Sequence, residues 1–269
     1  MRERNVEFEI ARNGRSIVHH TLVLLSHLIA SLAPCLNCSL TLPRRERRIL
    51  AATAAGVVVW TVAFKSPPSP PLGTEVDVPS EPVAITGSAT GSQKAPLVVM
   101  VFSDFECPYC GEFARETWPL LANEYVRPGA VQFVFRHLPL SRHKRAERTA
   151  QAAECAGQQG KFWPMHDQVF AHQLDLSDTA LIRHAVAVGA DREPFDQCMQ
   201  RASPPEISAD ASLAKRLGIQ STPAFLIGRR ESGNRMRVDS VILGANPVGT
   251  FRDKISPLLN DTSRQQPQR

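Results

Sequence analysis

The sequence predicts an α/β domain that carries a helical insertion and is preceded by an N-terminal membrane anchor. From residue 97 to residue 135 an apolar stretch, a helical pattern and a second apolar stretch follow one another. This βαβ order implies a parallel pair of strands. The pattern is then helical from about 141 to 217, and two more strands and a last helix follow.

The first strand is expected at residues 97–102, which are apolar throughout, as in a strand buried on both faces of a sheet. A helix follows the cysteine motif at residues 107–110, and the second strand covers residues 130–135. The remaining elements are expected as strands at 224–227 and 238–243 and a last helix that ends near Leu258.

Composition and charge limit the possible partners. The chain has 269 residues, of which 43% are hydrophobic and 21% charged, so wholesale disorder is excluded. Residues 1–65 hold nine Lys or Arg against four Asp or Glu, whereas residues 66–269 hold 22 of each. A neutral domain without a basic patch offers no surface for phosphate backbones, so we expect no nucleic-acid partner.

Residues 1–65 are predicted to be a membrane or signal-anchor region. The basic cluster Arg44–Arg48 precedes an apolar run at residues 49–64, and no small-residue cleavage site follows. The positive charge would stay in the cytoplasm, which puts the rest of the chain on the periplasmic side of the inner membrane. An earlier uncharged stretch, Ser16–Pro43, is either a first transmembrane helix or lies upstream of the true start.

The rest of the chain divides by composition. Residues 66–94 are rich in Pro, Ser, Thr and Gly, which predicts a linker. Residues 95–259 have the length of one domain, with the helical insertion at about 141–217. Residues 260–269 are polar and are expected to form a flexible tail.

The segment Cys107-Pro108-Tyr109-Cys110 lies where a buried strand leads into a helix. The free N–H groups of a helix N-terminus stabilise an anion, and a thiolate is the nucleophile of disulfide exchange. Pro108 suits the first helical turn, because the N–H that it lacks would be unpaired there. We expect Cys107 to be the exposed attacking thiol and Cys110, one turn further, to be the resolving thiol.

A C-x-x-C segment is also half of many zinc sites. A zinc site would need two more ligands, and the nearest candidates, Cys155 and Cys198, lie in the helical insertion. We therefore favour a redox pair and expect neither a metal nor a cofactor.

The motif and its surroundings resemble the DsbA-like branch of the thioredoxin superfamily. The resemblance rests on residues 102–111, on the helical insertion and on Ser221-Thr222-Pro223-Ala224-Phe225, and covers residues 95–259. It implies a thioredoxin fold with an inserted helical subdomain, which acts on thiols of other exported proteins.

By this resemblance Pro223 matches the cis-proline that faces the C-x-x-C motif in the family, and Thr222 precedes it. The backbone of residue 222 would pair with an extended substrate peptide. Strong oxidants of the family carry His after the Pro of the motif, whereas this chain has Tyr109. Tyr109 supplies no positive charge, so we expect a smaller depression of the Cys107 pKa and leave the direction of electron flow open.

Two acidic residues flank the motif. Asp104 and Glu106 are candidate proton acceptors for Cys110, and the alternative is that both are solvated carboxylates of an exposed loop.

The other four cysteines are interpreted separately. For an exported domain of this family, Cys155 and Cys198 are best explained as a structural disulfide; a second redox centre that exchanges with Cys110 is the alternative. Cys35 and Cys38 are interpreted as incidental or as absent from the mature protein.

The leading hypothesis is an exported, membrane-tethered thiol:disulfide oxidoreductase that exchanges its Cys107/Cys110 disulfide with cysteines of folding exported proteins. A membrane quinone-linked oxidase would reoxidise it. One alternative is a reductase or isomerase, which a thiol reductant would serve. Another is a peptide-binding chaperone module without catalysis.

Overall fold

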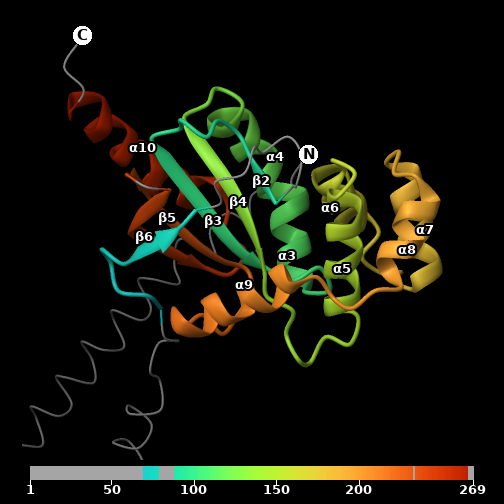
Figure 1. Cartoon of the computed structure of the whole chain (residues 1–269). Helices are drawn as coiled ribbons and strands as arrows, with labels where there is room; N and C mark the ends of the chain where they lie inside the picture. Colours follow the sequence, from blue (N-terminus) through green and yellow to red (C-terminus); the bar gives the residue numbers. More distant parts are fainter. Residues whose placement is uncertain (1–68, 79–87, 233, 266–269) are drawn as a thin grey trace, which may run out of the picture. The chain divides into compact units, whose positions relative to one another are not determined.

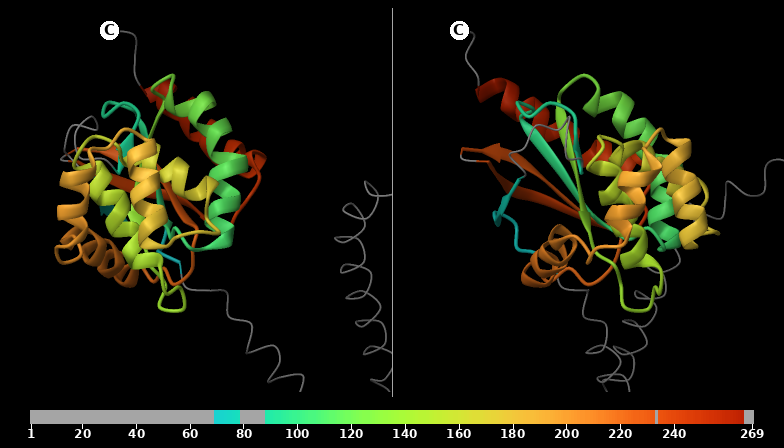
Figure 2. Two further views of the ribbon diagram at one scale, coloured as in Figure 1. Left: turned by 90° about the vertical axis from the view of Figure 1, so that its right-hand side faces the viewer. Right: turned by 45° about the vertical axis from the view of Figure 1, so that its right-hand side comes forward.

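The computed structural model describes residues 69–78, 88–232 and 234–265. These residues form a six-stranded sheet in the order β1-β6-β5-β3-β4-β2, with helices on both faces (Figure 1, Figure 2). The strands are β1 (Glu75–Asp77), β2 (Ala89–Thr90), β3 (Leu97–Ser103), β4 (Val131–His137), β5 (Ala224–Glu231) and β6 (Arg235–Leu243).

One long helical segment connects β3 to β4. It consists of α3 (Pro108–Glu112), the π-helical turn η2 (Phe113–Thr117), α4 (Trp118–Leu121) and a second π-helical turn, η3 (Ala122–Val126). Strands β3 and β4 are parallel, from Leu97 opposite Val131 to Ser103 opposite His137. The predicted βαβ unit is therefore confirmed, and it brings the carboxyl ends of both strands to one edge of the sheet.

The predicted helical insertion is also confirmed. The chain between β4 and β5 forms α5 (Ala146–Gly157), α6 (Phe162–Ala171), α7 (Asp178–Ala187), α8 (Arg192–Met199) and α9 (Pro205–Arg216). A last helix, α10 (Val248–Gln265), follows β6.

Strand β3 is buried along its whole length because both faces of the sheet are covered. Leu97, Val99 and Val101 pack into the core beneath the long helical segment and the insertion. The alternate residues of β3, from Val98 to Phe102, pack into a second core with Ala214 of α9. This double coverage explains why the strand reads as an unbroken apolar run.

The structure departs from the predicted linker over residues 66–94. Strand β1 pairs with β6, and β2 pairs with β4, so both lie at the edges of the sheet. Val76 of β1 is buried although the flanking composition is typical of a linker. Edge strands this short bond through their backbone and need few apolar side chains, so composition does not reveal them.

The structure also departs from the predicted end of the last helix and the tail at residues 260–269. Helix α10 ends at Gln265 rather than near Leu258. The sequence has no Gly or Pro between Asn260 and Gln265, so nothing in it interrupts the helical hydrogen bonds before Pro267.

The predicted membrane anchor at residues 1–65 lies outside the described residues, and so do Cys35 and Cys38. Within the described ranges, no helix has both the length and the apolar character needed to cross a membrane.

Cys155 in α5 and Cys198 in α8 form a disulfide, with their Cα atoms 5.6 Å apart. This is the pair that we expect from the sequence to be bonded. The bond joins two helices of the insertion across 43 residues of chain.

Replacing both of these cysteines with Ser should lower the free energy of unfolding by about 4 kcal/mol, because the bond limits the freedom of the unfolded chain. Urea unfolding of the full chain and of the double variant measures the difference. The Cys107→Ser/Cys110→Ser variant serves as the control for loss of two sulfurs. Equal midpoints for all three proteins would contradict a stabilising role.

Candidate active site

The C-x-x-C motif lies at the carboxyl end of β3, where the chain turns into α3 (Figure 1). Cys107 is the N-cap residue of α3 and Pro108 occupies the first turn, as the sequence predicts. The free backbone N–H groups of this turn therefore surround the Cys107 sulfur.

Cys107 is buried, with 1% of its surface exposed. The prediction that it is an exposed thiol is therefore wrong. Its Sγ lies 3.5 Å from the carbonyl oxygen of Thr222, and in the thiol form it donates to that oxygen. Tyr109 is the exposed residue of the motif, at 61%. A substrate sulfur must displace neighbouring groups to reach Cys107.

A side-chain hydrogen bond from Cys110 lowers the pKa of Cys107 from 9.0 to about 5, against the opposing effect of burial. The side chain of Thr222 and the backbone of Cys110 and Tyr109 lower the Cys107 pKa further. Cys107 is therefore a thiolate at neutral pH. The depression is large although Tyr109 supplies no positive charge.

Cys110 shows the opposite behaviour. Burial raises the pKa of this thiol well above its ordinary value, and both the hydrogen bond to Cys107 and the charge on Cys107 raise it further. Its Sγ also accepts a hydrogen bond from the backbone N–H of Asp104, at 3.5 Å. Cys110 stays protonated and is the donor to the Cys107 thiolate.

The Thr222–Pro223 peptide bond is cis. Strand β5 begins at the next residue, and Ala224 is opposite Phe102 near the end of β3. This pairing brings Thr222 against the redox loop although 115 residues separate it from Cys107. The two motifs that the sequence predicts as one site therefore meet.

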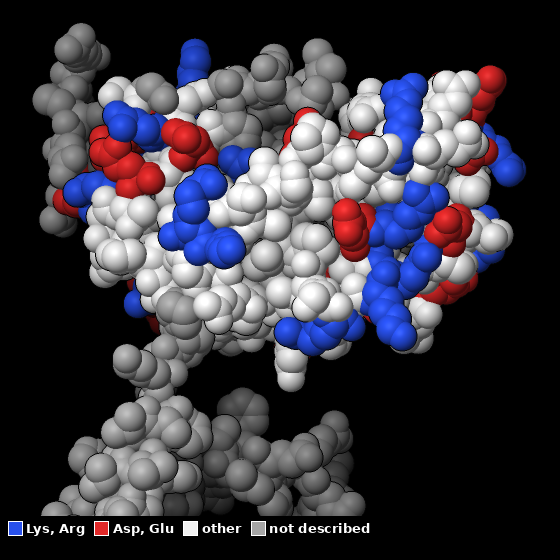
Figure 3. Space-filling model, turned by 60° about the horizontal axis from the view of Figure 1, so that its bottom comes forward, with Lys and Arg blue, Asp and Glu red and all other residues white. Residues whose placement is uncertain are grey.

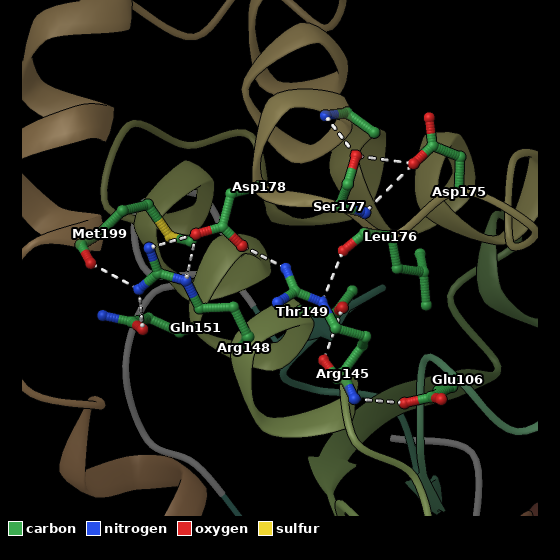
Figure 4. Close-up of polar contacts among 11 residues, drawn as sticks. Glu106, Arg145, Arg148, Thr149, Gln151, Asp175, Leu176, Ser177, Asp178 and Met199 are labelled. Carbon is green, nitrogen blue, oxygen red and sulfur yellow. Dashed lines mark hydrogen bonds and ion pairs between the residues drawn. The ribbon is translucent and has the colours of Figure 1, made fainter.

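Asp104 and Glu106 are bound to neighbouring segments rather than solvated. Asp104 is buried, and its carboxylate accepts from the backbone N–H groups of Glu106 and Leu140, each at 2.8 Å. Its Oδ2 is also 2.7 Å from Nδ1 of His143. The Glu106 carboxylate accepts from the backbone N–H of Arg145 (Figure 4). For Asp104 the exposed-loop alternative is wrong, because the segment after β4 folds over it.

One residue of the site has no counterpart in the sequence analysis. Gln173, in the turn after α6, donates from Nε2 to the carbonyl oxygens of Phe105 and Cys107, each at 2.8 Å. It is a polar residue in a connecting segment, 66 residues from Cys107. Nothing in the local pattern indicates that it reaches the redox loop.

The end of the molecule that carries the redox loop faces the viewer in Figure 3. Uncharged residues fill the middle of this face, and Lys and Arg side chains lie on both sides of it. Among the described residues, no group of three or more His, Cys, Asp or Glu is arranged to hold a metal ion.

A family model described as Thioredoxin matches residues 84–241. The chain belongs to the thioredoxin family. The predicted resemblance is thus confirmed, because the similar solved structures include proteins named DsbA.

The crystal structure of alpha-DsbA1 from Wolbachia pipientis is 25% identical, with a TM-score of 0.59, and the match covers 66% of this chain and 93% of that one. A thioredoxin-like oxidoreductase from Silicibacter pomeroyi is also 25% identical, with a TM-score of 0.53 and coverages of 66% and 92%. These neighbours support an oxidoreductase enzyme.

The curated relatives carry a different name. The Na(+)/H(+) antiporter NhaA 3 of Salinispora tropica is 33% identical over 234 residues, which are 86% of this chain and 31% of that protein. The NhaA 1 antiporter of Mycolicibacterium vanbaalenii is 36% identical over 195 residues, which cover 69% and 31%. The chain thus spans about a third of the length of these relatives, and their name describes much longer proteins.

Replacing Cys110 with Ala should raise the pKa of Cys107 by about one to two units, because a hydrogen bond to a charged group is lost. The measurement is the rate of iodoacetamide alkylation at Cys107 against pH, read by peptide mass spectrometry on the reduced full chain. In the parent the rate should reach half of its maximum near pH 5.

The Cys110→Ser variant is the matched control, since its hydroxyl still donates. Its midpoint should fall between those of the parent and the Ala variant. An Ala variant with the parent's midpoint would show that the Cys110 thiol does not stabilise the thiolate.

Proposed function

We propose that the chain is an exported thiol:disulfide oxidoreductase that exchanges its Cys107/Cys110 disulfide with cysteines of folding exported proteins. The opposite pKa shifts of the two sulfurs carry the proposal. Cys107 is a stabilised thiolate and Cys110 a protonated thiol one helical turn away. This is the arrangement that disulfide exchange requires.

In the oxidising direction, a substrate thiolate attacks the Cys107 sulfur of the disulfide and the Cys110 sulfur leaves and takes up a proton. A second substrate thiolate then attacks the substrate sulfur of the mixed disulfide, and Cys107 leaves as a thiolate. Two substrate thiols are oxidised to one disulfide, and the Cys107/Cys110 pair gains both electrons. The low pKa of Cys107 makes it a good leaving group in the second step.

Reduction of the Cys107/Cys110 disulfide by substrate thiols requires proton transfer at Cys110. Asp104 has more support for that role than Glu106, because its backbone N–H contacts the Cys110 sulfur and its carboxylate contacts His143. The His143 side chain is 15% exposed, so it connects the buried carboxylate to solvent.

Substrate recognition is proposed at the Thr222–Pro223 segment, whose backbone lies beside the Cys107 sulfur. An extended peptide would bond there through its main chain. The uncharged middle of the surrounding face supports protein substrates of varied charge (Figure 3).

The proposal includes a location and a reoxidant. The basic and apolar order within residues 1–65 supports an inner-membrane anchor with a periplasmic domain. The relatives named as Na(+)/H(+) antiporters are consistent with a membrane location, because an antiporter exchanges ions across a membrane. A membrane quinone-linked oxidase would then restore the disulfide.

The redox potential decides between oxidation and reduction. A stabilised thiolate favours the reduced form of the Cys107/Cys110 pair. We therefore expect the pair to be an oxidant, with a reduction potential of about −120 mV rather than about −270 mV. Equilibration of the full chain with glutathione, read at the Cys107/Cys110 peptide, measures it. A value near the lower figure would assign the chain to the reductase alternative.

Trapping identifies the substrates. Expressed in its own cells, the Cys110→Ala variant should accumulate mixed disulfides through Cys107, because an intramolecular thiol can no longer release the partner. The Cys107→Ala variant is the matched control and should accumulate none. If Cys107→Ser supports normal disulfide formation in exported proteins, the chaperone alternative is favoured and the proposed enzyme is excluded.

A further inference from the structure

Gln173 bonds two carbonyl groups of the redox loop with a single side-chain amide. Its Nε2 donates to the oxygens of Phe105 and Cys107, each at 2.8 Å. The two carbonyls lie on either side of Glu106, so the amide fixes two peptide planes of the segment that leads into α3. The side chain is partly buried and comes from the helical insertion.

The Gln173 side chain is itself held in place. Its Oε1 accepts from Nη1 of Arg115 at 3.5 Å. A Cβ atom at Gly111 would lie 2.1 Å from the same Oε1 and 2.6 Å from the Arg115 Nη1. The absence of a side chain at position 111 thus leaves the space that Gln173 occupies over the first turns of the helix.

The segment that follows Gln173 is tied to α5 (Figure 4). Arg145 donates from Nε to the carbonyl oxygen of Leu176 at 2.9 Å and forms an ion pair with Asp178. The backbone N–H of Arg145 binds the Glu106 carboxylate of the redox loop. One residue therefore anchors both the Gln173 segment and the loop that Gln173 bonds.

We propose that Gln173 is a positioning residue that fixes the backbone of Cys107 relative to the first turn of α3. It acts through the Cys107 carbonyl group and does not touch the reacting sulfur. The inference rests on the proposed role of Cys107 as the nucleophile.

The carbonyl that Gln173 bonds also accepts the N–H of Gly111 at 3.1 Å, so it closes the first turn of the helix. The Tyr109 and Cys110 N–H groups that stabilise the Cys107 thiolate belong to this turn. If the Cys107 peptide rotates, the sulfur loses its alignment with them. The charged and titratable groups around the loop include Cys110, Arg115, Asp104, Glu106, His143 and Arg145, and the rings of His137 and His166 lie beside Phe105.

The test is the Gln173→Leu variant of the full chain, which keeps the apolar part of the side chain and removes the amide. The alkylation midpoint of Cys107 should rise by about one pH unit, the shift that corresponds to weakening of one hydrogen bond to a charged group. Gln159→Leu is the matched control. Gln159 is also partly buried in the insertion and bonds the N–H and carbonyl of Asp191, away from the loop. Its midpoint should equal that of the parent.

A second variant tests whether Gln173 acts through its position over Gly111. Gly111→Ala should displace the Gln173 amide and raise the midpoint in the same direction, and the Gly111→Ala/Gln173→Leu variant should add little to either single shift. A Gln173→Leu chain with a lower melting temperature and the parent's midpoint would reduce Gln173 to a structural role and overturn the proposal. Fully additive shifts would overturn it as well.

The parent separates this inference from the proposed function. If Cys107 of the parent reacts as an ordinary free thiol, both the nucleophile and its positioning are wrong. If the parent midpoint is low and Gln173→Leu leaves it unchanged, only the inference is wrong.

Discussion

The hydrogen bond from the Cys110 thiol to the Cys107 thiolate is the interaction on which the chemistry of this site depends. It is the largest cause of the lowered Cys107 pKa, and it contributes to the raised Cys110 pKa. The bond exists only while the two sulfurs lie one turn apart at the start of a helix. Strand β3, which ends at Ser103, and helix α3, which begins at Pro108, fix that arrangement.

This interaction explains why Tyr109 is compatible with a low thiolate pKa. A positively charged residue in the motif is one way to stabilise the anion, but the donors here are a thiol and the backbone of the first turn. These donors are neutral, so salt should screen their effect less than that of an exposed cation. The exposed Tyr109 ring is then available to contact partners.

The sequence predicts those parts of the fold and site that depend on residues close together in the chain. The βαβ unit follows from two apolar runs, and Cys107 and Cys110 follow from their position between strand and helix. Pro223 required a resemblance, because no local pattern links it to residues more than a hundred positions earlier.

The rest depends on contacts between distant segments that carry no periodic signal. Strand β1 has three residues and is defined by its pairing with β6, in which Glu75 lies opposite Arg237 and Asp77 opposite Arg235. The position of Asp104 in a loop is compatible with an exposed carboxylate, but the segment at Leu140 and His143 covers it. Side-chain amides such as that of Gln173 bond whatever backbone lies near, so only the folded structure identifies their role.

The asymmetry of the two sulfurs also bears on the direction of electron flow. A Cys107 pKa below its ordinary value of 9.0 stabilises the reduced pair at every pH above about 5. The stabilisation is full above pH 9, declines as the pH falls, and is lost below about 5, where the thiolate is protonated. At neutral pH it favours the reduced form of the Cys107/Cys110 pair, which supports the proposed oxidising direction. Burial of Cys110 keeps this second sulfur protonated. The Cys107 thiolate at the N-terminus of α3 is therefore the single reactive anion of the pair.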